Sequence, residues 1–156
     1  MADKAWKALD RATDSYLRAG DVVLTDKAVE TLRERLGASD PTALRLIGDR
    51  APDRPELVRE LMPELFAAAL GITPYAARAR FVLAGLHPAA RDSLLEPLVS
   101  REIANPDPER WDELRGLAML LEQIGRDDML EFLKDAVRDS PEEALRWIAE
   151  DFPEHG

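Results

Sequence analysis

The chain has 156 residues, of which 46% are hydrophobic and 33% are charged, which is enough to build one cored domain over residues 1–156. It contains no cysteine, so disulfide bonds, thiolate chemistry and cysteine-ligated metals are excluded. The formal net charge of −10 argues against a protein that binds nucleic acid by neutralising phosphates.

The first predicted elements are two helices joined by a short connection. Residues 3–19 form a helix that gathers four large side chains on one side, namely Trp6, Leu9, Tyr16 and Leu17. Gly20 is expected to end this helix, and Thr25 is expected to cap a second helix that Gly37 ends. The two helices together predict a leading hairpin over residues 3–37.

Four later helices are predicted to begin at a capping residue followed by proline. Proline at the first helical position loses no needed donor, and the side chain before it accepts a hydrogen bond from a free backbone amide. The pairs are Asp40-Pro41, Thr73-Pro74, Asp107-Pro108 and Ser140-Pro141, so the prolines are 33, 34 and 33 residues apart. This spacing predicts hairpin units at 41–73, 74–107 and 108–140, and a closing helix at 141–152.

The unit 108–140 carries the clearest pattern. Its first helix has an apolar stripe at helical spacing, and its second helix has another: Trp111, Leu114, Leu117, Leu121 and Ile124, then Met129, Leu130, Leu133, Ala136 and Val137. Gly125 fits a left-handed C-terminal cap between them. Gly116 interrupts the first helix at a cost of about 1 kcal/mol relative to alanine. Close approach of another helix would justify that glycine.

Two prolines lie inside predicted helices, at Pro63 and Pro97, and each is expected to kink its helix. A pocket between the kinked helices is therefore one hypothesis for a binding site. Arg78 and Arg80 lie in an apolar helix nearby. They are expected to snorkel to the surface, with an anion site as the alternative.

No stretch alternates at period two, so the fold class is all-α, with about nine helices in antiparallel hairpins. The constant spacing of hairpin units favours an α-solenoid-like array. The alternative is an irregular globular helical bundle, because two helices of ordinary length and two short loops sum to about this period anyway.

In spacing and hairpin layout, residues 41–152 resemble α-solenoid repeat proteins of the HEAT and tetratricopeptide kinds. The likeness to HEAT repeats rests on the corner Ile124-Gly125-Arg126-Asp127-Asp128 and the leucine-rich helix after it. The likeness to tetratricopeptide repeats rests on repeat length and on Trp111 and Leu114, whereas Arg115 stands where that family has a small residue. The resemblance implies a scaffold that binds other proteins on its surface.

The acidity is concentrated in the last third of the chain. Residues 1–107 hold 15 basic and 17 acidic side chains, whereas residues 108–156 hold 6 and 14. Six carboxylates around one corner are candidate contacts for a basic partner: Glu122, Asp127, Asp128, Glu131, Asp135 and Asp139. The simpler interpretation is a solvated helix face, but like charges at these spacings repel, so stability alone does not account for the row.

The sequence contains no catalytic signature, no metal-ligand pattern and no cofactor motif, and its only histidines are His87 and His155. We therefore expect a non-enzymatic protein–protein interaction module, an adaptor or regulator whose acidic C-terminal third docks a protein with a basic surface. The first alternative is an acidic immunity or antitoxin-like inhibitor of a basic enzyme. The second is an enzyme or small-molecule binder with its pocket near Pro63 and Pro97.

Further expectations concern assembly and location. Trp147 and Phe152 on the last helix are candidate interface anchors, and a homodimer through that helix is one arrangement they allow. The start MADKAWKALD has no apolar signal core, and the longest apolar run, residues 66–72, is too short to span a bilayer. We expect a cytoplasmic protein without membrane contact. Arginine outnumbers lysine 17 to 4, which mildly suggests a bacterial source with a GC-rich genome.

Overall fold

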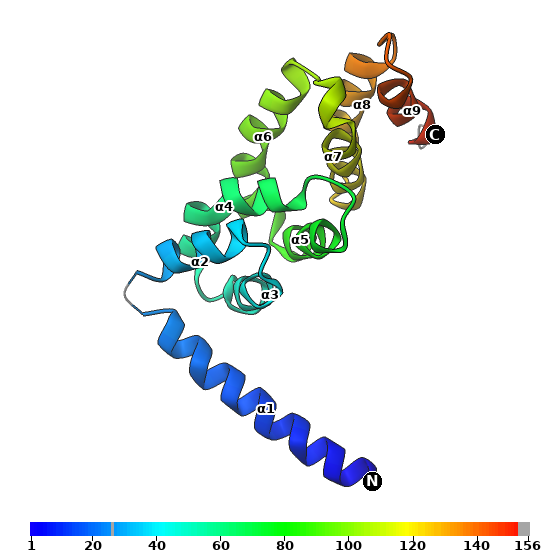
Figure 1. Ribbon diagram of the computed structural model, residues 1–156. Helices are drawn as coiled ribbons and strands as arrows, with labels where there is room; N and C mark the ends of the chain where they lie inside the picture. Colours follow the sequence, from blue (N-terminus) through cyan, green and yellow to red (C-terminus); the bar gives the residue numbers. More distant parts are fainter. Residues whose placement is uncertain (26, 153–156) are drawn as a thin grey trace.

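The computed structural model describes residues 1–25 and 27–152, and in these residues it contains nine α-helices, one 3-10 turn and no strand. The prediction of an all-α fold with about nine helices is thus confirmed (Figure 1). The helices are α1 (Ala2–Val23), α2 (Ala28–Gly37), α3 (Pro41–Arg50), α4 (Pro55–Ala69), α5 (Pro74–Gly85), α6 (Pro88–Ala104), α7 (Trp111–Gln123), α8 (Asp127–Val137) and α9 (Glu143–Asp151), with the 3-10 turn η1 (Pro108–Arg110) before α7.

From α2 onward the helices alternate between two layers. In one layer α2, α4, α6 and α8 pack in succession, and in the other α3, α5, α7 and α9 do the same. The closest packing between helices that follow each other in the chain is found at α4–α5, α8–α9 and α7–α8. This arrangement is consistent with a short solenoid or with a helical bundle.

The packed hairpins do not all coincide with the units that proline spacing predicts. The pair α7–α8 forms the packed hairpin expected within 108–140. In contrast, α3–α4 of unit 41–73 and α5–α6 of unit 74–107 are not among the closely packed pairs, while α4–α5 packs most extensively of all. In this part of the chain the packed pair begins one helix later than predicted, because the buried residues of α4 contact helices of both layers.

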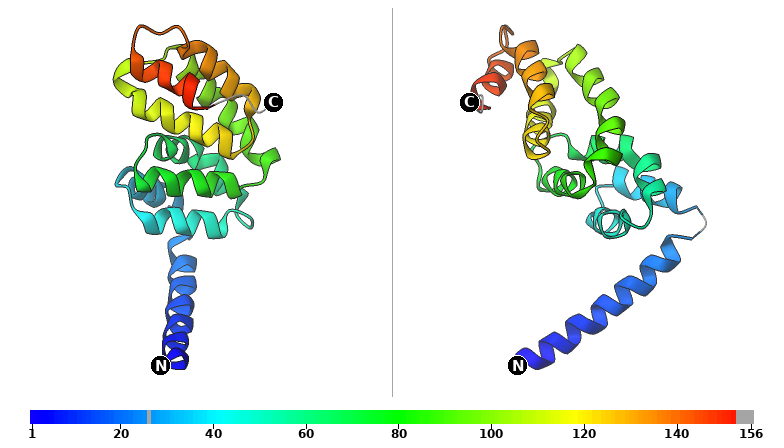
Figure 2. Two further views of the ribbon diagram at one scale, coloured as in Figure 1. Left: turned by 90° about the vertical axis from the view of Figure 1, so that its right-hand side faces the viewer. Right: turned by 180° about the vertical axis from the view of Figure 1, so that it is seen from behind.

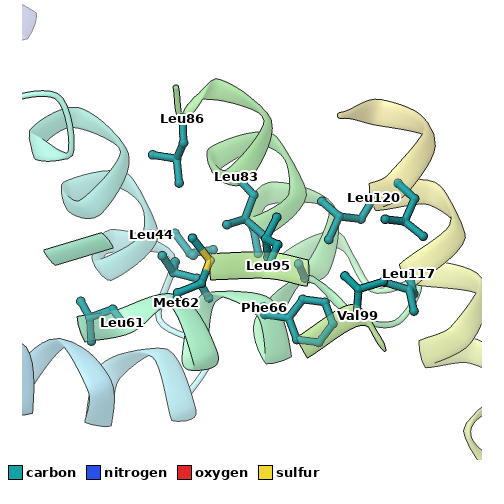
Figure 3. Close-up of a cluster of buried hydrophobic side chains, with 14 of the residues drawn as sticks. Leu44, Leu61, Met62, Phe66, Leu83, Leu86, Leu95, Val99, Leu117 and Leu120 are labelled. Carbon is teal, nitrogen blue, oxygen red and sulfur yellow. The ribbon is translucent and has the colours of Figure 1, made fainter. Parts of the chain in front are cut away.

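The hydrophobic core lies between the two layers. Figure 3 shows side chains from five helices and one helix end meeting there: Leu44, Leu61, Met62, Phe66, Leu83, Leu86, Leu95, Val99, Leu117 and Leu120. Each is at most 8% exposed, and full burial of such a side chain contributes about 1.5–3 kcal/mol. Pro63 and Pro97 lie on the exposed sides of α4 and α6, which continue past them.

Three of the four predicted caps are found where the sequence places them, whereas the closing helix α9 begins at Glu143, with Glu142 and not Ser140 at its N-cap. Asp40 Oδ1 accepts a hydrogen bond from Thr42 N (2.9 Å), and Thr73 Oγ1 accepts one from Ala76 N (3.1 Å). Asp107 accepts one from Glu109 N (3.0 Å), although the helix it starts is the 3-10 turn η1. These caps are local, so they form whatever the packing of the helices around them.

A close backbone contact joins α7 to the turn after α4. Gly116 is buried within α7, and a Cβ built on it would lie 2.9 Å from the carbonyl carbon of Gly71, and closer still to Gly71 N and O. Gly71 itself has φ +92°, the left-handed region that favours glycine. The close approach expected for Gly116 is therefore present, but its partner is a turn and not a helix.

Buried arginines hold the chain at two helix ends. Arg80 is only 3% exposed, and its Nη1 donates to Ala69 O (2.9 Å), at the end of α4, and to Gly71 O (2.6 Å), in the turn after it. The expectation that Arg80 snorkels to the surface is therefore wrong, because these carbonyls would otherwise have no helical donor. Arg91 is buried as well and donates to Leu83 O (3.3 Å) at the end of α5.

The first helix, α1, projects away from the two layers, and its N-terminus lies far from the rest of the protein (Figure 2). It is not among the helices that pack closely on α2, so residues 3–37 do not form the predicted leading hairpin. Gly20 does not end α1 but is buried inside it, where a Cβ would lie 3.0 Å from Leu46 Cδ1 of α3. Thr25 Oγ1 donates to Val22 O (2.6 Å), so it closes α1 and does not cap α2.

Candidate functional site

A groove of about 970 Å³ runs between α3 and α5, the two helices of the odd-numbered layer that lie nearest to α1. Its apolar lining includes Val58, Ala77, Phe81, Val82 and Leu86. Phe81 is 75% exposed, although it is a large aromatic side chain. Exposed apolar side chains gathered around a concave surface are typical of a site that binds another apolar surface.

Four ionisable side chains, Arg45, Asp49, Arg78 and His87, line the same groove. Arg45 and Asp49 are paired with each other across one helical turn, with Nε 3.7 Å from Oδ2. His87 Nδ1 accepts a hydrogen bond from Ala89 N (3.2 Å), so it serves as the N-terminal cap of α6. Arg78 is exposed and makes no ion pair with any described residue, so it leaves an uncompensated positive charge at the groove.

The end of α1 is anchored at the rim of this groove. Tyr16 donates through its hydroxyl to Asp49 Oδ2 (2.7 Å), and the guanidinium of Arg45 lies 4.1 Å from the centre of the Tyr16 ring. Burial, and then the hydrogen bond to Asp49, raise the pKa of Tyr16 to about 12. Arg50 adds a second anchor, since it donates to Leu17 O (3.0 Å) and to Asp21 (2.7 Å).

The outer turns of α1 present an apolar stripe that no residue in the described part of the chain covers. Trp6 is 65% exposed and Leu9 is 58% exposed. Both lie on the same side of the helix as Tyr16, because Leu9 follows Trp6 by three residues and Tyr16 follows Leu9 by seven. The sequence therefore predicts the stripe correctly, but the structure leaves it in solvent, whereas a leading hairpin would have buried it.

Five of the six predicted acidic contacts are exposed. Glu122 lies in the last turn of α7 and Asp139 in the turn after α8, while the other four lie on α8. Three are paired with basic side chains nearby: Asp128 with Arg126, Glu131 with Lys134 and Asp135 with Arg138. Hydrogen bonding from Arg126 also lowers the pKa of Asp128. Of the others, Glu122 lies near the end of α7, while Asp127 and Asp139 have no ion-pair partner among the described residues.

One aromatic side chain lies among these acids. Phe132 is 67% exposed on α8, four residues after Asp128 and three before Asp135, so all three share a helix face. The pattern of the sequence did not single it out, because one phenylalanine outside the apolar stripe of α8 carries no signal of its own. Phe132 is therefore an exposed aromatic side chain on a face where three of the carboxylates are paired with bases.

The two candidate anchors at the C-terminal end differ in their surroundings. Trp147 is 48% exposed on α9, as an interface anchor requires. Phe152 is buried, with the guanidinium of Arg115 5.9 Å from its ring centre, so the expectation that it is available to a partner is corrected. Asp151, the last residue of α9, also pairs with Arg115 of α7 (2.8 Å), which holds this end of the helix against α7.

Acidic side chains near the two helix prolines, Pro63 and Pro97, are engaged in ion pairs within the fold. Glu64 pairs with Arg33 (2.5 Å), and Glu96 and Asp92 both lie within ion-pair distance of Arg126. Among the described residues no group of three or more His, Asp or Glu side chains is placed to hold a metal ion. His155 lies outside the described residues. Neither Pro63 nor Pro97 lines the α3–α5 groove, so the groove is not the pocket that the sequence suggested.

Comparison with other proteins gave no assignment: the chain matches no protein-family model, no curated protein and no solved structure. Within the described part of the chain, no helix combines the length and apolarity needed to cross a bilayer.

Proposed function

We propose that this protein is a non-enzymatic protein–protein interaction module that binds an amphipathic helix in the groove between α3 and α5. The observation that carries the proposal is the apolar groove of about 970 Å³ with the exposed ring of Phe81 beside it. An amphipathic helix lays one apolar face into such a groove and keeps its polar face in solvent. The two-layer packing of α2 to α9 supports this proposal, because stacked helical hairpins present grooves between neighbouring helices of one layer.

A second candidate surface is the acidic face of α8. The exposed ring of Phe132 among carboxylates favours it, because aromatic side chains dominate the binding energy of many interfaces. A partner with a basic surface would dock there, in an adaptor complex or in an inhibitor of the immunity or antitoxin type. The pairing of Asp128, Glu131 and Asp135 with bases reduces the uncompensated charge of this face, so we rank it second.

The test is site-specific photo-crosslinking in lysate of the natural host. The photoreactive amino acid p-benzoylphenylalanine replaces Phe81 in one variant, Phe132 in a second and the exposed Met119 of α7 in a control. The groove proposal expects a discrete adduct from position 81 whose crosslinked peptide maps to an amphipathic helix, at low and at high salt. A discrete adduct from position 132 alone, lost at high salt, would transfer the function to the acidic face. The absence of a specific adduct at position 81 would overturn the groove proposal.

A further inference from the structure

We propose that the helix bound in the α3–α5 groove is α1 of a second copy of this chain, so that two copies exchange their first helices reciprocally. This inference rests on the proposed function and names the partner of that site. Four observations carry it: the uncovered stripe of α1, the position of the groove beside it, the charges around both, and the matching lengths.

The outer part of α1 needs a covering surface. The stripe Trp6, Leu9, Tyr16 and Gly20 follows alternating three- and four-residue steps when Thr13 is included, the spacing of a helix seam that packs on a partner. Only its inner end, Tyr16 and Gly20, contacts α3. Most of the stability of a helix in a protein comes from packing of its apolar face, so the exposed Trp6 and Leu9 point to a partner surface.

The groove that would cover the stripe is open in the same region of the molecule. Tyr16 sits on Arg45 and Asp49, and these two residues also line the groove. From that point α1 diverges from the two layers toward its N-terminus, so α1 and the odd-numbered layer form the two sides of a wedge that opens away from α2 (Figures 1 and 2). The wedge of each copy then has room for α1 of the other. When two copies exchange their α1 helices about a two-fold axis, both stripes and both grooves are covered, so no binding surface is left for a third copy.

The stripe of α1 and the α3–α5 groove carry opposite charges and have similar lengths. Arg78 at the groove has no ion-pair partner, and Asp10, next to Leu9 on the flank of the stripe, has none either among the described residues. Opposite unpaired charges favour this pairing over a direct pairing of two α1 helices, where each helix would bring an Asp10 that has no ion-pair partner among the described residues. The segment from Trp6 to Tyr16 spans about 15 Å at 1.5 Å per residue, which is also the length of the 10-residue helix α3.

The experiment measures the molar mass of the full chain by sedimentation and light scattering over a range of concentrations. The wild-type chain is expected at twice 17.4 kDa. Trp6→Glu removes the stripe and Phe81→Glu removes the groove. Each variant is expected to sediment as a monomer that still unfolds cooperatively, because both side chains are exposed and lie outside the hydrophobic core. Phe132→Glu is the matched control, an equally exposed aromatic on α8, and is expected to stay dimeric.

Mixing the two monomeric variants separates exchange of α1 from other dimers. The Phe81→Glu copy retains a good α1 and the Trp6→Glu copy retains a good groove, so a mixed pair keeps one of the two contacts. We expect differently labelled variants to form a heterodimer by energy transfer, weaker than the wild-type dimer, while neither variant pairs with itself.

Three results would overturn the inference. A wild-type chain that is monomeric at all concentrations would reject the second copy as occupant, and the crosslink from position 81 would then decide separately whether another helix binds the groove. A dimer that survives Phe81→Glu but not Trp6→Glu would show that two α1 helices pair directly. A dimer that survives both would place the interface elsewhere, for instance at Trp147 on α9.

Discussion

The contact between Gly116 and Gly71 gives the sharpest prediction about stability. Gly116→Ala adds one methyl group inside α7, where alanine is ordinarily preferred over glycine by about 1 kcal/mol. The added Cβ would lie 2.9 Å from the carbonyl carbon of Gly71 and nearer still to its N and O. The neighbour is backbone, and its carbonyl is held by a 2.6 Å hydrogen bond from Arg80, so it cannot yield without losing that bond.

The magnitude follows from the two opposing effects. Overpacking a well-packed site costs typically about 1–3 kcal/mol, and a clash with hydrogen-bonded backbone belongs at the upper end. Subtracting the gain of about 1 kcal/mol in helix propensity leaves a net loss of roughly 2 kcal/mol in the free energy of unfolding. For a chain of this size, that corresponds to a fall of about 4–8 °C in the melting temperature.

The assay is thermal and urea unfolding followed by circular dichroism at the helix band. Gly48→Ala is the matched control, because Gly48 is also inside a helix, but a Cβ there would meet Val82 Cγ2 at an ordinary 3.4 Å. The control is expected to gain roughly 0.5–1 kcal/mol. If Gly116→Ala matches or exceeds the stability of the wild type, the close approach of α7 to the turn after α4 is refuted.

The other predictions concern three single positions. Arg80→Met leaves the carbonyls of Ala69 and Gly71 without their donor and should lower the free energy of unfolding by about 1–3 kcal/mol, measured in urea. The pKa of Tyr16 is raised, so its contribution to anchoring α1 is complete below the unfolded-state pKa of 10.0 and is lost as the pH rises to about 12. Ultraviolet titration should detect this late ionisation of the Tyr16 hydroxyl, and Tyr16→Phe should abolish the signal. Phe132→Ala should change stability by less than about 0.5 kcal/mol, since the ring is exposed.

Local features of the fold could be predicted from the sequence because their physics is local. The side chains of Asp40 and Thr73 accept hydrogen bonds from backbone amides two and three residues later, so the start of α3 and α5 depends on no distant contact. The left-handed turn at Gly125 (φ +72°) is equally local. The same holds for the apolar stripes, which is why the helices and most of their boundaries follow from spacing alone.

Features that depend on which helices meet could not be predicted in the same way. Gly20 has the sequence signature of a helix end, yet α1 continues through it because Leu46 of α3 packs where a side chain would stand. Arg80 has the signature of a surface residue, yet it is buried because the turn at Gly71 presents carbonyls to it. In both cases the deciding neighbour is distant in the chain, and one sequence does not reveal it.

The sequence pointed to a charged surface as the candidate site, whereas the structure favours an apolar groove, for a related reason. A row of acidic residues is visible in a sequence, but its compensation is visible only when Arg126, Lys134 and Arg138 are seen beside it. An apolar residue, conversely, is assumed to be buried until its exposure is measured, and Phe81 and Trp6 are exposed. Because an exposed large apolar side chain gains more from a partner than a solvated and paired carboxylate does, the groove and α1 are the surfaces on which binding should first be sought.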